Sequence, residues 1–261
     1  MPRPVFPPAN KRLGQHFLID QNIVRKIVAV AELTSEDTIL EIGPGRGILT
    51  EALSHAARRV VTIEIDSELC ELLQGRQPQW KNVEIICADA LTHPFETMPV
   101  GSTVVANLPY YISTPLLFKF LEHRGHFRRL VLMLQNEVAD RLVAKPGGAE
   151  YGVLSVMTQY AAEVTKAFKV SAHCFRPRPD VGSAVAILRP RHGELLLSPQ
   201  QEGSFAAVVK AAFAHRRKTL VNSLRDEGYE APIVTQTVAA MRLSPTVRAE
   251  VLTLDQFKEL A

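Results

Sequence analysis

The chain has 261 residues, of which 46% are hydrophobic and 22% charged, as in globular proteins with a sizeable core. Its net charge of +3 is mildly basic, and its three cysteines are odd in number with no Cys-x-x-Cys spacing, which argues against a disulfide framework or a zinc site. No apolar run reaches the roughly 20 residues that cross a bilayer. We therefore expect a cytoplasmic protein with no metal, beginning with an extended tail over residues 1–8.

Short apolar runs alternate with helical patterns from about residue 20 to residue 190. Runs rich in β-branched and aliphatic residues predict buried strands at 38–42, 60–64, 83–87, 103–106 and 130–134, and two more strand-like segments follow at 164–170 and 183–188. Helices are predicted at 48–57, 67–74, 115–122 and 135–144. For the third of these, Thr114 is the expected N-cap and Pro115 the first helical residue. This alternation predicts an α/β fold with a parallel sheet and helices on both faces.

The pattern changes after a linker at residues 189–193. Helices are predicted at 202–214, 218–226, 232–241 and 255–260, and no further strand is indicated. The sequence therefore predicts a first domain over residues 1–193, with an N-terminal tail at 1–12, and a small all-helical domain over 194–261.

A glycine-rich loop follows the first of these strands. The segment Glu41-Ile42-Gly43-Pro44-Gly45-Arg46-Gly47 runs from a strand into a helix, where glycines let the backbone approach a ligand and the helix N-terminus supplies amide donors. The dinucleotide fingerprint requires glycine at position 48, which is isoleucine, and no Gly-Lys-Ser/Thr of a P-loop follows. The Gly-x-Gly-x-Gly spacing resembles the first motif of class I methyltransferases, whose cofactor is S-adenosylmethionine.

Two carboxylates end the next two strands. Glu64 is placed to accept both ribose hydroxyls of such a cofactor, and Asp89 to accept the amino group of its adenine. Either residue alone is more often an ordinary carboxylate at a strand end. Together with the glycine loop, they favour cofactor binding.

The fourth strand is followed by Asn107-Leu108-Pro109-Tyr110, which resembles the Asp/Asn-x-Pro-Tyr/Phe motif of amino-group methyltransferases. The Asn107 amide oxygen and the Leu108 carbonyl would accept both hydrogens of an aromatic amine and aim its lone pair at the methyl group. Pro109 would stiffen the turn, and Tyr110 would stack on the base. A β-turn with no function is the alternative, which this position in the sheet makes less favourable.

Basic residues form four clusters, which indicate an anionic partner. One of them is His215-Arg216-Arg217-Lys218, for which phosphate contact is favoured over a solvated helix face. Phe175, in a proline-rich loop, is a candidate stacker on RNA, with a buried core aromatic as the equal alternative.

The chain closely resembles the ribosomal RNA adenine dimethyltransferases, and within them the bacterial small-subunit branch, over nearly its whole length. The matching segments are 12–18, 110–115, 134–138, 151–156, 175–185, 215–220, 222–224 and 248–250. Three departures are His16, where many relatives carry asparagine, Tyr111, where asparagine is frequent, and the loop at 176–180, where Arg-Pro-Arg-Pro-Asp stands for the usual Pro-Pro-Pro-Lys.

The resemblance implies a Rossmann-like methyltransferase domain with a helical, rRNA-contacting C-terminal domain. It implies that His16 and Leu18 contact the cofactor together with Gly43, Gly45, Glu64, Asp89 and Asn107. The expected reaction converts two adjacent adenosines in the 3′-terminal hairpin of small-subunit (16S) rRNA to N6,N6-dimethyladenosine. The expected partner is the immature small subunit, bound by a monomer.

Three alternatives stay open at this point. The first is a large-subunit rRNA methyltransferase of the antibiotic-resistance type, which shares the catalytic core. The second is a ribosome-assembly factor, for which binding to the subunit matters more than methyl transfer. The third is a DNA adenine methyltransferase, disfavoured because no domain that reads base sequence is evident.

Overall fold

The computed structural model describes residues 7–193 and 197–261, and the chain divides into two compact units. The first unit comprises the residues up to 139 together with 164–190, and the second comprises 140–163 and 191–261. All four helices predicted for residues 194–261 lie in the second unit, which also takes in 140–163. The domain boundary at residue 193 stays a prediction. Residues 1–6 of the predicted N-terminal tail lie outside the described residues.

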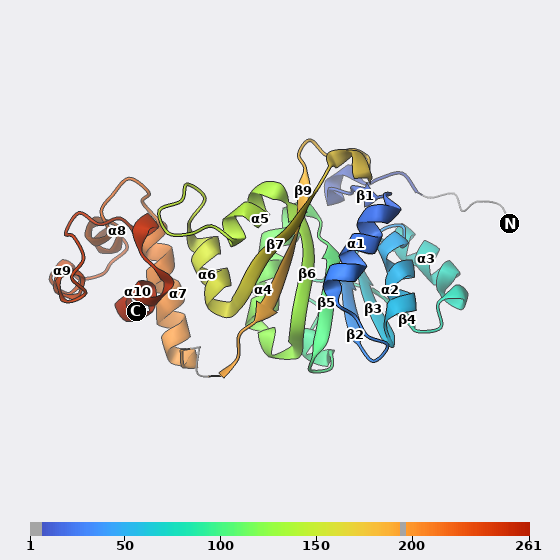
Figure 1. The fold of residues 1–261 in the computed structure, drawn as a ribbon, viewed down its shortest axis with the longest axis horizontal. Coiled ribbons are helices and arrows are strands. Elements are labelled where there is room, and N and C mark those ends of the chain that lie inside the picture. Colours follow the sequence, from blue (N-terminus) through green and yellow to red (C-terminus); the bar gives the residue numbers. More distant parts are fainter. Residues whose placement is uncertain (1–6, 194–196) are drawn as a thin grey trace. The chain divides into compact units, whose positions relative to one another are not determined.

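A seven-stranded sheet forms the centre of the first unit, in the order β4-β3-β2-β5-β6-β9-β7 (Figure 1). The strands are β2 (Thr38–Ile42), β3 (Arg59–Glu64), β4 (Val83–Cys87), β5 (Ser102–Asn107), β6 (Phe127–Gln135), β7 (Ala162–Val170) and β9 (Ser183–Pro190). The neighbours from β4 to β6 are parallel, whereas β9 is antiparallel to β6. All seven strands lie where the sequence predicts them, and the chain order reverses at β2, between β3 and β5.

The helices of the first unit are α1 (Gln21–Ala31), α2 (Ile48–Ala56), α3 (Ser67–Arg76) and α4 (Ser113–Glu122). A fifth helix, α5 (Asn136–Leu142), begins there. One hydrophobic cluster joins α1 and α2 to strand residues such as Ile39 of β2. The next residue, Leu40, is also fully buried but does not belong to this cluster. Because successive strand residues face opposite sides, both faces are covered at the central strands, which explains their continuous apolar runs. The burial predicted for 83–87 is wrong beyond Val83, because β4 lies at the edge of the sheet.

Stacked and edge-to-face aromatic rings form a separate cluster around α4. Phe95 stacks on Phe120 with ring centroids 5.0 Å apart, and Phe127 meets both rings edge-on. All three side chains are fully buried. This cluster fixes α4, the helix that follows the predicted acceptor motif, against the start of β6.

Helices make up most of the second unit. They are α6 (Val153–Ala161), α7 (Pro199–Phe213), α8 (Leu220–Asp226), α9 (Ala231–Ala240) and α10 (Leu254–Leu260). Tyr160 packs on Phe205 of α7 at 4.6 Å, and Phe213 stacks on Phe257 of α10 at 5.6 Å. Among the residues that the structure describes, no helix combines the length and apolar character that crossing a membrane requires.

Several elements differ from the prediction or were not predicted. Helix α4 begins at Ser113 rather than Pro115, because a 3-10 turn at Tyr110–Ile112 runs directly into it, so Thr114 is not its N-cap. Helices α1 and α6 were not predicted. Nor was the small antiparallel pair β1 (Phe17–Leu18) and β8 (Phe175–Arg176).

Candidate active site

A cavity of about 790 Å³, including its open mouth, lies at the carboxyl ends of β2, β3 and β5. The N-terminal segment, the glycine loop and the acceptor turn line it together with Glu64 and Phe175. Ligands of open α/β sheets bind at this edge, where the strand order reverses. Three segments that are remote in the sequence are therefore brought to one place.

The glycine loop needs glycine because of its backbone and its close neighbours. Gly43, Gly45 and Gly47 have φ values of 64°, 56° and 77°, in the left-handed region that disfavours side chains. A Cβ at Gly45 would lie 2.9 Å from the Phe17 ring, and one at Gly47 would lie 2.9 Å from Trp80. The loop backbone thus forms a wall of the cavity with no side chain at its glycine positions.

Glu64 is held at the end of β3 by backbone amides. Its Oε2 accepts the amide of Gly45 at 3.3 Å, and its Oε1 accepts the amides of Ile65 and Asp66, each at 3.0 Å. The side chain is only 5% exposed, and this burial raises its pKa in spite of the three amide donors. A carboxylate offers about four lone-pair positions, and the three amides use three of them. To accept two hydroxyls of a ligand, Glu64 must therefore release one amide or share a position between an amide and a hydroxyl.

A second acidic side chain, Glu41, lies beneath the glycine loop at 1% exposure. Its Oε2 accepts the hydroxyl of Thr50 at 2.7 Å. Burial, with a contribution from the neighbouring Glu64, raises its pKa to about 8. Glu41 is therefore mostly protonated at neutral pH, which keeps a second negative charge away from Glu64.

The acceptor turn is anchored on both of its sides. Asn107 ends β5, and its Nδ2 donates to the His16 carbonyl at 3.4 Å, which leaves the amide oxygen as an acceptor. The amide of Leu108 donates to the Met133 carbonyl at 3.1 Å. The Tyr110 hydroxyl is hydrogen-bonded to Ser183 Oγ at 2.7 Å, and burial raises the pKa of this tyrosine. The turn thus presents acceptors and an aromatic ring in a fixed arrangement.

His16 connects the N-terminal segment to the acceptor turn. Its Nδ1 donates to the Pro177 carbonyl at 2.9 Å, and its ring centroid lies 5.7 Å from that of Tyr110. The next residues, Phe17 and Leu18, pair with β8 and are buried. Phe175 of β8 is 1% exposed and belongs to the hydrophobic cluster, although it also lines the cavity. Stacking of Phe175 on RNA stays a prediction, and it would require this ring to be uncovered.

Asp89 lies at the same edge of the sheet but does not line the cavity. Its Oδ1 accepts the amide of Leu91 at 2.8 Å. Tyr111, half exposed at the cavity rim, links this carboxylate to the cavity: burial raises its pKa, and the charges of Asp89 and Glu64 raise it further. A role of Asp89 in cofactor binding stays a prediction.

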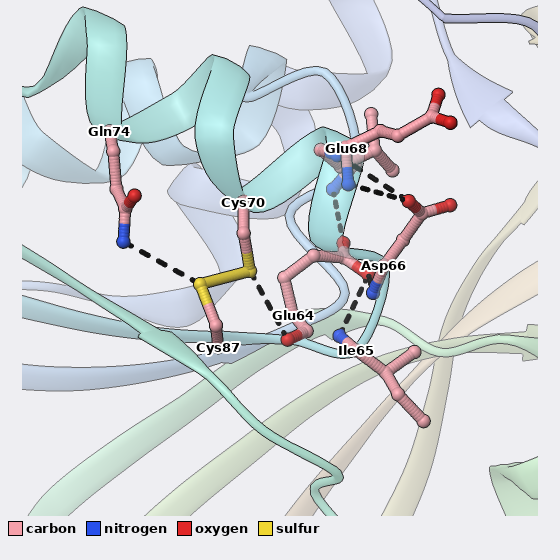
Figure 2. The surroundings of a disulfide bond; sticks show 9 residues. Glu64, Ile65, Asp66, Glu68, Cys70, Gln74 and Cys87 are labelled. Atoms are coloured by element: carbon pink, nitrogen blue, oxygen red, sulfur yellow. Dashed lines mark hydrogen bonds between the residues drawn. A yellow bond between two sulfur atoms is a disulfide. The ribbon is translucent and has the colours of Figure 1, made fainter.

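Cys70 of α3 and Cys87 at the end of β4 form a disulfide beside this site (Figure 2). The Cys70 sulfur lies 3.5 Å from the Glu64 carbonyl oxygen, and Cys87 is two residues before Asp89. The expectation of no disulfide is wrong for this pair. Helix α3 packs on β4 and brings the two Cα atoms to 5.9 Å, a tertiary proximity that neither cysteine count nor spacing reveals.

The predicted RNA-binding residues of the basic run lie in the second unit. Arg216 donates to the Ala149 carbonyl at 3.2 Å, and Lys218 is paired with Asp226. Arg217 is exposed and has no partner among the residues that the structure describes. No group of metal-ligating side chains is found in residues 7–193 and 197–261.

The reversal of strand order, the left-handed glycines and the carboxylates after consecutive strands define a class I methyltransferase. Solved structures agree with this assignment. A dimethyladenosine transferase from Plasmodium falciparum has a TM-score of 0.82 at 28% identity, over 94% of this chain and 96% of that one. The 23S rRNA methyltransferase ErmE has a TM-score of 0.72 at 28% identity, over 94% of this chain and 97% of that one.

Sequence comparison identifies the family. The profile of the family described as "Ribosomal RNA adenine dimethylase" matches residues 8–260. A protein of Moorella thermoacetica named "Ribosomal RNA small subunit methyltransferase A" is 41% identical over 96% of this chain and 91% of the relative. A protein of the same name from Geobacter metallireducens is 40% identical over 97% of this chain and 94% of the relative. The chain belongs to the ribosomal RNA adenine dimethylase family, whose members are enzymes that use a methyl donor.

Sequence reasoning missed several residues that shape the site. Phe17 closes the cavity under the guanidinium of Arg46, which lies 4.5 Å from its ring centroid, and Ser183 holds Tyr110. Their positions depend on the pairing of β1 with β8 and on the register of β9 against β6. The match to the family's opening motif was the one available signal, and it pointed to the segment rather than to these contacts.

Proposed function

We propose that this protein transfers methyl groups from S-adenosylmethionine to N6 of two adjacent adenosines in the 3′-terminal hairpin of small-subunit rRNA. The observation that carries the proposal is that the Asn107–Tyr110 turn and the glycine loop line one cavity. A methyl donor and a base amine can therefore meet there. Such juxtaposition removes much of the entropic barrier of a bimolecular reaction.

The residues of the cavity fit S-adenosylmethionine. The glycine loop offers a wall that is bare at Gly43 and Gly45, and Leu18 supplies apolar surface. Glu64 would accept the ribose hydroxyls, Asp89 the adenine amino group, and the His16 segment would cover the amino-acid portion. The cofactor supplies an electrophilic methyl group on a sulfonium. The protein's part is to bind and orient it.

The acceptor turn has the groups that orienting an aromatic amine requires. The Asn107 amide nitrogen donates to the His16 carbonyl, so the amide oxygen would accept one hydrogen of the base amine, and the Leu108 carbonyl would accept the second. With both hydrogens held in the first transfer, the nitrogen lone pair would be aimed at the methyl group, and the methylated nitrogen would then release a proton to solvent. Tyr110 would stack on the base, which contributes about 1–3 kcal/mol.

The names of the relatives favour small-subunit RNA over the large-subunit alternative. The two curated relatives described above, at 41% and 40% identity, are small-subunit methyltransferases by name, whereas ErmE is a 23S rRNA methyltransferase by name and is 28% identical. Exposed Arg217 and the basic residues beside it would contact RNA phosphates. We further propose that the protein works as a cytoplasmic monomer on the immature small subunit.

Mass spectrometry of ribosomal RNA tests the proposal. Small subunits from a strain without this modification are incubated with the protein and S-adenosylmethionine, with large subunits and DNA as parallel substrates. Two adjacent N6,N6-dimethyladenosines in small-subunit RNA alone are expected. Methylation of large subunits or of DNA would instead assign the corresponding alternative, and no methylation at all would refute the reaction.

A variant pair tests the site. Asn107→Ala is expected to slow transfer by about 100-fold or more, since orienting groups of this kind contribute that much. It should still bind the immature subunit, because the basic residues are elsewhere. Asn22→Ala, an exposed asparagine of α1, is the matched control and should leave the rate unchanged. Normal transfer by Asn107→Ala would contradict the assignment.

A further inference from the structure

The ammonium group of Lys119, on α4, is engaged by the backbone of the turn that follows β4. Its Nζ donates to the carbonyls of Ala90 at 3.1 Å, Leu91 at 2.8 Å and His93 at 2.5 Å. It also lies 4.5 Å from the ring centroid of Phe95. Since an ammonium has three hydrogens, all of them are used on one turn.

The same turn directs its amides toward Asp89. The amides of Thr92 and His93 donate to the Asp89 carbonyl at 3.1 and 2.9 Å, and the amide of Leu91 donates to the Asp89 carboxylate at 2.8 Å. Residues 89–93 therefore form a hydrogen-bonded turn that carries the Asp89 carboxylate on its amides and the Lys119 ammonium on its carbonyls.

Packing alone does not account for a lysine at this position. Burial lowers the pKa of Lys119, so placing its charge here has a cost that an apolar side chain on α4 would avoid. Lys119 makes no ion pair with a carboxylate among residues 7–193 and 197–261. The charge is instead committed to the backbone turn that carries Asp89.

We propose that Lys119 is a positioning residue for the adenine end of the cofactor: it fixes the 89–93 turn so that the Asp89 carboxylate can accept the adenine amino group. Asp89 Oδ1 already accepts Leu91, and no other donor to this carboxylate is found in the described part of the chain, so Oδ2 remains an acceptor. The inference rests on the proposed role of Asp89. It adds that the helix following the acceptor turn also organises the donor site.

Calorimetry with two ligands tests the inference. The ligands are S-adenosylhomocysteine and its purine analogue, in which hydrogen replaces the 6-amino group. For wild type, the amino group should improve affinity by about ten- to a hundredfold, as for a hydrogen bond to a charged acceptor. Lys119→Met should reduce this advantage by about three- to tenfold while binding the purine analogue within twofold of wild type. Lys119→Arg, which can also donate to several carbonyls, should retain most of it.

Two further variants separate the possible failures. Asp89→Ala should abolish the advantage of the amino group, and if it does not, the proposed adenine contact of Asp89 is wrong. If Asp89→Ala abolishes it but Lys119→Met weakens both ligands equally or neither, the positioning role of Lys119 alone is refuted. Lys166→Met, at a lysine that donates to Asn136 Oδ1 at 2.9 Å, is the matched control and should bind both ligands as wild type does. Should Lys119→Met not fold, Lys119→Gln carries the same comparison.

Discussion

The buried carboxyl of Glu41 makes a testable prediction about stability and pH. In the folded protein its pKa is raised to about 8 from the ordinary value of 4.5, because the side chain is fully buried. Between these two values the folded state binds more protons than the unfolded state, so stability falls as pH rises. At about 1.36 kcal/mol per pH unit, the loss from pH 4.5 to pH 8 amounts to roughly 5 kcal/mol at most.

Glu41→Gln removes this titration and preserves the shape of the side chain, and its amide oxygen can still accept the Thr50 hydroxyl. Urea unfolding at pH 5, 6.5 and 8 should show a flatter profile than wild type, with little difference at pH 5 and the variant several kcal/mol more stable at pH 8. Glu71→Gln, at an exposed position of α3, is the control and should follow the wild-type profile. If Glu41→Gln loses stability with pH as steeply as wild type, the reasoning from burial fails.

Three further predictions concern the loop, the acceptor turn and the RNA. Gly47→Ala should lower the free energy of unfolding by about 1–3 kcal/mol in thermal melts, because φ is 77° and the added Cβ would lie 2.9 Å from the Trp80 ring. The control Gly75→Ala has open space around the added Cβ and should be neutral or stabilising. Tyr110→Phe, which loses the bond to Ser183, should slow single-turnover methylation about three- to tenfold, and an unchanged rate would exclude a role for that bond. Arg217→Ala should weaken RNA binding and lower the salt-dependence slope by about one, as measured by titration at several salt concentrations.

The central strands β2, β3, β5, β6 and β9 were predictable from sequence because they are buried on both faces and bounded by turn residues, whereas the edge strands β4 and β7 are partly exposed. The helix α1 was missed because Gln21–Ala31 contains several β-branched residues that suit a strand as well as a helix, although its buried residues 23, 24, 27 and 31 recur at helical spacing. What fixes the helix is Asp20, whose side chain accepts the amides of Asn22 and Ile23 at its N-terminus. The Thr114 cap was wrong because the acceptor turn, rather than a capping side chain, starts α4.

The site residues that the motifs predicted follow strands directly, so their positions are set by the sheet. Glu64, Asp89 and Asn107 belong to this group, and the structure brings all of them to one edge. Residues that act through tertiary contacts could not be found in this way. Lys119 carries no local signal, since its partners lie in a turn 26 to 29 residues earlier in the chain.

The pairing of β1 with β8 has a consequence for the order of events during synthesis. Phe17 pairs with Arg176 and His16 donates to Pro177, so the wall of the cavity joins chain segments about 160 residues apart. Closing so long a loop is slow and comes after local structure has formed. A nascent chain therefore lacks a complete donor site until residues beyond 177 have left the ribosome. An enzyme that modifies ribosomes is therefore itself incomplete while the first 177 of its 261 residues are being translated.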